Sequence, residues 1–361
     1  MTDRTTDPFL WIIPLLLAIF GILMIFSLTS HTSLEEYGSP FALGMRQLEW
    51  LLAGICAMVA MYMIPVSFWE KHSGHLWLFS LSLLLLTLIP GIGIKAGGAR
   101  RWIGVGPLRF QPIELATMAV AVHLPKLLCR SGKRGISAFV SITIPVLLLS
   151  VVPLLFQPNI GGTILIFGLA MAIHVHCRGW SWPFIVGFTG FPFVFMLFIR
   201  AGYRLRRYIA FLDPWEQPMD SGFQVIQGLV AFSNGGIFGV GVGKGLQKLN
   251  YLPAAHTDYI FAAVGEEFGF AGTFLVLFLF LLWTVRALNA YKAASGFHEA
   301  LVWALAVSVL LPMFINLGGV LKLMPLTGIP LPFISYGGSS LLFMWARIGL
   351  LMRVSREVSL T

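Results

Sequence analysis

The chain consists mainly of long apolar stretches that are separated by short polar segments. Many of these stretches approach about 17 to 25 residues, the length that crosses a bilayer as an α-helix. A helix satisfies its own backbone polar groups, which lipid cannot do. The pattern therefore predicts an all-α polytopic membrane protein with about ten transmembrane helices. The predicted spans are Leu10–Thr29, Trp50–Val66, Leu76–Pro90, Pro112–Leu128, Phe139–Phe156, Gly161–His176, Trp182–Arg200, Tyr259–Thr284, Glu299–Val320 and Ser339–Met352.

One connection, between the seventh and eighth predicted spans, is much longer than the others. It covers residues 201–258, and we expect it to form one large extracytoplasmic loop. Within it, Phe223, Ile226, Leu229 and Val230 recur at helical spacing, which predicts a short amphipathic helix on the membrane surface. The glycine-rich run 239–245 lacks the spacing of a phosphate-binding loop and is expected to be flexible. We find neither an internal repeat nor a soluble domain, so residues 1–361 are interpreted as a single integral membrane domain.

Composition supports the membrane interpretation. The chain is 57% hydrophobic and 11% charged, whereas soluble domains carry about 25% charged residues. We attribute the net charge of +9 to lipid phosphates and topology rather than to nucleic acid. Once the long connection is set aside, most Lys and Arg residues, Arg347 among them, fall on the side of both termini. We therefore expect a multi-pass protein of the cell inner membrane with cytoplasmic termini.

Two arginine clusters fall on the predicted outer side, where the topology rule disfavours cations. The first contains Arg100 and Arg101, and the second contains Arg204, Arg206 and Arg207. The guanidinium fork binds phosphate oxygens in pairs, so these clusters suit an anionic ligand. The alternative is that they anchor the protein to lipid headgroups.

Asp258 stands where the eighth apolar run begins, beside His256 and after the cationic loop. An aspartate at this place is a frequent helix N-cap. A carboxylate in a partly dehydrated cleft can also act as a general base. The two roles are compatible, and the residue types alone do not decide between them.

Three further acids lie inside predicted spans: Glu114, Glu266 and Glu267. Acids within a membrane are costly and usually face a cavity or a partner, so each either lines a site or bonds a neighbouring helix. Helical rotation allows only Glu266 to share a cavity wall with Asp258. The segment Met324–Leu342 is rich in Pro and Gly, which indicates either a rigid re-entrant loop lining a cavity or an ordinary tight connection.

Six motifs occur in an order that resembles the SEDS family of shape, elongation, division and sporulation proteins, and their wording is closer to its cell-division branch. The motifs are "GARRWI", "FQPIE", "FQPNIGGT", "RRYIAFLDPW", "QKLNYLPAAHTDYIFAAVGEE" and "LPFISYGGSSLL". The resemblance implies ten membrane helices and a peptidoglycan glycosyltransferase that polymerises lipid II during septal cell-wall synthesis. It also implies that undecaprenyl pyrophosphate is released and that the enzyme works beside a class B penicillin-binding protein and other division proteins.

The resemblance makes Asp258, in the HTD motif, the expected catalytic residue. A divalent cation, Mg²⁺ or Mn²⁺, is left open as a cofactor with unassigned ligands, and no organic cofactor is expected. A lipid II flippase or transporter, which intramembrane acids would suit, and a non-catalytic scaffold that activates a partner synthase are the alternative functions. The expected substrate-binding residues are Arg100, Arg101, Glu114, Arg204, Arg207, His256, Lys248 and Ser340.

The chain departs from the family pattern at three positions. The family usually reads QPSE with a lysine three residues later, where this chain has Ile113 and Thr117. It usually reads QPDLG, where this chain has Asn159. We therefore expect Glu114 to lack a charged partner and Thr117→Lys to stabilise the protein, unless Asn159 and Thr117 changed together to keep the local charge balanced.

Overall fold

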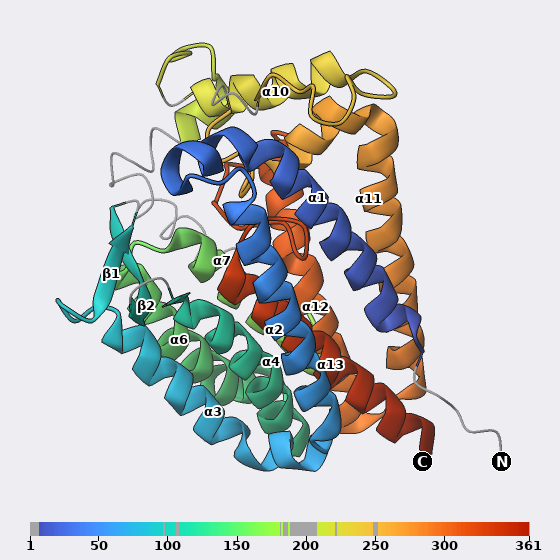
Figure 1. Cartoon of the computed structure of the whole chain (residues 1–361). Coiled ribbons are helices and arrows are strands. Elements are labelled where there is room, and N and C mark those ends of the chain that lie inside the picture. Colours follow the sequence, from blue (N-terminus) through green and yellow to red (C-terminus); the bar gives the residue numbers. More distant parts are fainter. Residues whose placement is uncertain are drawn as a thin grey trace.

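The computed structural model describes residues 7–96, 98–105, 108–180, 182, 187, 208–220, 222–247 and 252–360. It shows a bundle of long helices that lie side by side (Figure 1). The long helices are α1 (Phe9–Tyr37), α2 (Ala42–Met63), α3 (Val66–Leu86), α4 (Pro112–Arg130), α6 (Ile144–Phe156), α7 (Ile160–Arg178), α11 (Ile260–Ala293), α12 (Gly296–Val320) and α13 (Gly338–Leu360). The shorter elements α5 (Gly135–Ala138) and the π-helix η1 (Phe139–Thr143) lead directly into α6.

Length and composition support a multi-pass membrane protein. Seven helical segments of the described chain are long and apolar enough to cross a membrane. Helices α3 and α13 match the third and tenth predicted spans and contain 21 and 23 residues, but they are more polar and fall outside those seven. The seventh predicted span, Trp182–Arg200, lies almost entirely outside the described residues. The total of ten spans therefore stays a prediction.

Helix α4 forms the centre of the bundle. Every residue from Pro112 to Pro125 is buried, and the helix packs against α3, α7, α12 and α13. A helix that is apolar on all sides is typical of such a central position. The acid in its first turn, Glu114, consequently has to find a partner inside the protein.

A small antiparallel sheet, which the all-α prediction did not include, connects α3 to α4. Its strands β1 (Gly93–Ala96), β2 (Ala99–Val105) and β3 (Leu108–Phe110) are arranged in that order. The strands are only three to seven residues long, so they give no clear alternation of apolar and polar residues. The sheet carries Arg100 and Arg101 on β2 and ends directly before Gln111, the N-cap of α4.

Helix α11 is broken at Gly269, where φ is 66° and ψ is −159°. This conformation is accessible essentially only to glycine. The N–H groups of Val240 and Gly241 donate to the carbonyl oxygens of Glu266 and Glu267, at 3.0 and 3.1 Å. The glycine-rich run, predicted to be a flexible loop, is thus hydrogen-bonded to α11 and satisfies the carbonyl groups that the break exposes.

Helix α10 (Phe223–Gly235) confirms the short helix predicted in the long connection. Part of the predicted apolar face packs against the protein and part of it is exposed. Ile226 and Ala231 are buried, whereas Leu229 and Val230 are each 36% exposed. The buried side follows from packing against α11 rather than from the apolar pattern alone. Figure 1 shows α10 across one end of the bundle, opposite the end where α13 finishes.

Candidate active site

The backbone of the HTD motif is held at each of its three carbonyl groups. The motif occupies a turn directly before α11. The N–H of Tyr336 donates to the oxygen of His256 at 2.9 Å, and the Ser335 hydroxyl donates to the oxygen of Thr257 at 2.7 Å. The amide of Asn316 on α12 donates to the oxygen of Asp258 at 2.8 Å. Asp258 therefore sits on a backbone fixed by two separate parts of the chain.

The Pro- and Gly-rich loop that supplies Ser335 and Tyr336 is itself packed and hydrogen-bonded. Leu331, Phe333 and Ile334 are buried in it. The side chain of Gln47 on α2 donates to the Ser335 carbonyl at 3.1 Å and accepts from the Gly337 N–H at 3.2 Å. Irregular backbone whose polar groups are satisfied by protein is the kind tolerated at membrane depth. The burial and hydrogen bonds of this loop are those that a rigid loop requires.

The Asp258 side chain does not occupy the capping position of α11. The N-cap of that helix is Tyr259, and no side chain caps it there. The Asp258 carboxylate is half-buried and faces Gly328, where an added Cβ would lie 3.3 Å from Oδ2. Gly328 has a φ of +77°, which favours glycine. A glycine there thus keeps side-chain atoms away from the carboxylate.

Arg101 and Asp258 flank the start of α7. The Arg101 guanidinium donates to the Pro158 carbonyl at 2.7 Å. Gly161 follows two residues after Asn159, and an added Cβ on it would lie 3.0 Å from the carbonyl oxygen of Thr327. Thr327 directly precedes Gly328. The contacts therefore lead from Arg101 through residues 158–161 and 327–328 to Asp258. Arg100 is half-buried on the same strand. Arg204, Arg207 and Lys248 lie outside the described residues.

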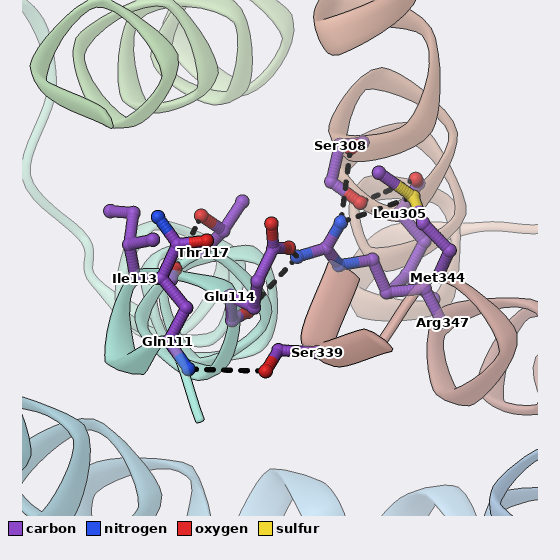
Figure 2. A network of polar contacts seen from close by, with 9 residues as sticks. All are labelled: Gln111, Ile113, Glu114, Thr117, Leu305, Ser308, Ser339, Met344 and Arg347. Carbon is purple, nitrogen blue, oxygen red and sulfur yellow. Dashed lines mark hydrogen bonds and ion pairs between the residues drawn. The ribbon is translucent and has the colours of Figure 1, made fainter. Parts of the chain in front are cut away.

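The structure gives Glu114 a charged partner, which corrects the expectation that it has none. Nη2 of Arg347 on α13 lies 3.1 Å from Oε2 of Glu114, and both side chains are buried. Figure 2 shows the Arg347 side chain pointing from α13 toward the start of α4. Arg347 is also fully buried, so it does not belong among the cytoplasmic charges to which the topology count assigned it.

The acids inside α11 bond other parts of the protein. The Glu266 carboxylate accepts hydrogen bonds from the N–H groups of Leu246 and Gln247, at 3.1 and 3.2 Å. The Glu267 carboxylate accepts from the Ser27 hydroxyl of α1 at 2.7 Å. Glu266 thus holds the end of the glycine-rich run, and Glu267 joins α11 to α1. Of the two roles left open by the sequence, the structure supports the bonding role for both.

His256 and Ser340 lie beside the elements described above. The His256 ring contacts the Tyr336 ring edge-to-face at 5.8 Å. Burial lowers the pKa of His256, and the nearby charge of Glu36 offsets this only in part. Ser340 is half-buried in the first turn of α13. Its neighbour Ser339 accepts from the Gln111 N–H at 3.1 Å, so α13 and α4 begin next to each other.

Asn159 has a structural role at the start of α7. Its side chain accepts a hydrogen bond from the Gly162 N–H at 3.1 Å and caps the helix. An amide oxygen serves this purpose as well as a carboxylate does. The departure from the family's aspartate therefore leaves the cap intact.

Within the described residues, no group of three or more His, Cys, Asp and Glu side chains is arranged to hold a metal ion. Thr327 precedes Gly328, which faces Asp258, and its buried hydroxyl has no hydrogen-bond partner. One carboxylate and one hydroxyl suit a Mg²⁺-type ion that is held mainly by substrate phosphates, and they are too few for an all-protein cage. A divalent cation thus fits this site only together with an anionic substrate.

Residues 7–360 match the family of FtsW, RodA and SpoVE cell cycle proteins. The chain belongs to this family, the SEDS proteins. This SEDS chain is 37% identical over 345 residues to a Thioalkalivibrio sulfidiphilus protein named probable peptidoglycan glycosyltransferase FtsW, which covers 93% of this chain and 86% of the relative. It is 37% identical over 368 residues to stage V sporulation protein E of Bacillus subtilis, with 99% of each chain covered.

A solved structure shows the same fold along nearly the whole SEDS chain. Its description reads "Structural coordination of polymerization and crosslinking by a peptidoglycan synthase complex". The TM-score is 0.80 at 26% identity, and the match covers 98% of this chain and 99% of that chain. The likeness to this structure and the membrane-type helices of the bundle support the predicted helical membrane fold.

Sequence reasoning missed several residues that build this SEDS site. Arg347 stands alone in an apolar run, and a lone cation there is a signal of a buried partner. Gln47 and Asn316 also lie in apolar helices, but their partners are backbone groups of distant segments. Nothing in the local sequence identifies such partners.

Proposed function

We propose that this protein is a peptidoglycan glycosyltransferase that polymerises lipid II into glycan strands during septal cell-wall synthesis. The main observation behind this proposal is that the backbone at Asp258 is held in place. The carbonyl groups of Asp258 and of the two residues before it each accept a hydrogen bond. Arg101 lies on the other side of residues 158–161. A carboxylate and a cation held on either side of one segment suit a reaction that removes a proton and releases an anion. The names of the relatives support peptidoglycan as the product.

In the proposed reaction, the 4-hydroxyl of a GlcNAc attacks C1 of the MurNAc at the growing end. Asp258 accepts the hydroxyl proton, and the C1–O bond to undecaprenyl pyrophosphate breaks. A direct displacement inverts the anomeric centre. A positioned general base typically contributes about 10² to 10⁴-fold to the rate. Asp258 is half-buried, so it is shielded in part while a hydroxyl can still reach it.

Arg100 and Arg101 are proposed to stabilise the departing pyrophosphate. Fixed cations at a developing negative charge lower the barrier because they need no reorganisation during the reaction. A divalent cation, Mg²⁺ or Mn²⁺, would be bound mainly by the pyrophosphate itself and would neutralise part of its charge. His256, Ser340, Lys248, Arg204 and Arg207 remain proposed substrate-binding residues. The Glu114 carboxylate is buried and paired with Arg347, so we propose a structural role for it in place of the expected contact with substrate.

The proposed setting is the cell inner membrane, with both termini in the cytoplasm and the site at the outer surface. The proposed partner is a class B penicillin-binding protein, together with other division proteins. The matching structure of a peptidoglycan synthase complex supports such a partner.

Purified protein, lipid II and the partner transpeptidase form the decisive assay. We expect Asp258→Asn to abolish polymer formation while its thermal unfolding in detergent stays close to that of the wild type, because the amide keeps the shape but loses the basicity. Glu216→Gln, which alters an exposed acid of the long connection, serves as the control and should retain activity. A folded Asp258→Asn protein with wild-type polymer yield contradicts the assignment. Wild-type protein that makes no polymer but stimulates the partner, or moves lipid II across vesicles, supports the scaffold or the flippase instead.

A further inference from the structure

A buried ion pair joins the start of α4 to the middle of α13. The guanidinium of Arg347 donates to the Glu114 carboxylate at 3.1 Å and to the Glu114 carbonyl at 3.0 Å. It also donates to the carbonyl of Ser308 on α12 at 3.4 Å. Arg347 is 0% exposed. One side chain therefore connects three helices, as Figure 2 shows.

Thr117 stands one helical turn after Glu114 and carries no charge to offer it. Thr117 is fully buried, and its hydroxyl donates to the Ile113 carbonyl of its own helix at 2.8 Å. Residues three apart on a helix are neighbours on its surface. A cation at position 117 would thus approach the same carboxylate that Arg347 contacts from α13.

The three helices joined by Arg347 also position both halves of the candidate site. Helix α12 carries Asn316 two turns beyond Ser308, and the Asn316 amide holds the Asp258 carbonyl. Helix α13 follows directly on Ser335 and Tyr336, which hold the two preceding carbonyls. Helix α4 begins just after β3, which pairs with the arginine-bearing strand β2, and its N-cap Gln111 is bonded to Ser339. A shift between these helices would change the distance between Asp258 and Arg101.

We propose that Arg347 is a positioning residue: by supplying from α13 the cation for Glu114 that position 117 of α4 lacks, it sets the arginine-bearing hairpin against the segment that carries Asp258. The pair excludes a second cation, because an extra buried charge would have no counter-ion. Thr117→Lys alone is then destabilising, which reverses the expectation drawn from the sequence. The kinetic part of this proposal rests on the proposed polymerase function, whereas the pairing itself does not.

The pairing is tested by thermal unfolding of the purified protein in detergent, without substrate. We expect Arg347→Leu to lower the melting temperature, since it leaves the Glu114 carboxylate buried and unpaired. Thr117→Lys should also lower it, and the double variant Arg347→Leu/Thr117→Lys should be more stable than either single variant. Arg130→Leu, which breaks an ion pair with Glu70 at the surface, is the matched control and should have a small effect. A double variant that is no more stable than Arg347→Leu overturns the proposal.

The positioning role is tested by polymerisation kinetics of the variants that fold. Among the described residues, Arg347 hydrogen-bonds to none that is proposed here to bind substrate, so its loss should lower kcat by about 10²-fold and leave KM within about threefold. The double variant with Thr117→Lys should recover most of kcat.

Glu114→Gln/Arg347→Leu removes both charges and should fold stably but stay slow. Wild-type kcat in this variant would mean that the pair only stabilises the fold, and it would overturn the positioning role. If Arg347→Leu does not fold, the two double variants still separate these outcomes. An inactive wild type refutes the polymerase function and leaves the stability cycle as an independent test.

Discussion

Adjacent residues of the same type have different partners in this protein. Glu266 and Glu267 follow one another in α11, yet the first holds the end of the glycine-rich run and the second bonds α1. Glu114 has the same charge and is paired with an arginine from α13. The cost of a buried acid predicts that each has a partner. Which partner it has depends on segments far away in the sequence, and no local pattern shows it.

His256 gives a prediction about pH at the residue scale. Burial lowers its pKa in the folded protein, whereas an unfolded histidine titrates near its ordinary value of about 6.5. The folded state therefore binds a proton less readily, and stability falls as the pH drops below about 6.5. Above that pH the residue has no such effect. We expect His256→Gln to reduce the loss of stability between pH 8 and pH 5, measured by unfolding in detergent. Equal acid sensitivity of the two proteins would contradict this.

At the scale of elements, the apolar pattern predicted most of the long helices but not their interruptions. The stretch that became α11 reads as continuous helix, because glycine inside an apolar run is common and the break at Gly269 needs a single unusual φ. The sheet of residues 93–110 was also missed. In each case the deciding contacts come from another element. At the break in α11, for example, they come from residues 236–241, which hydrogen-bond to the helix.

Replacing Gly269 by alanine tests the break in α11. A Cβ at this position would lie 2.4 Å from the Gly239 nitrogen and 2.6 Å from the Ile237 carbonyl oxygen, and the backbone conformation disfavours alanine. We expect Gly269→Ala to lower the free energy of unfolding by about 3 kcal/mol. Gly74→Ala on α3 is the control, since its nearest neighbour would be 3.5 Å away. A loss at Gly269 no larger than at Gly74 would show that the break is not required.

On the scale of the whole molecule, composition and span length predicted a helical membrane protein, and the six motifs predicted its family. The candidate site was predicted in part. Arg101 was singled out by residue type and Asp258 by the family resemblance, and the structure connects them through the start of α7. Asn316, Gln47 and Arg347 were not identified, because they act on distant backbone or on a distant acid. Fixing the position of a site takes long-range contacts, whereas composition is enough to indicate its chemistry.

The orientation in the membrane is a whole-molecule prediction that thiol labelling can test. Cys129 is exposed in the last turn of α4, and its thiol donates to the carbonyl of Gly296, the first residue of α12. The predicted orientation places this end of α4 in the cytoplasm. Met219 is 88% exposed in the long connection, toward the end that carries α10. With Cys56 and Cys177 replaced by serine, a maleimide that cannot cross the membrane should leave Cys129 unlabelled in intact spheroplasts and label it after permeabilisation. Met219→Cys in a cysteine-free background should be labelled in both cases. The reverse pattern would place the site in the cytoplasm, where the pyrophosphate-releasing reaction proposed for the outer surface could not occur.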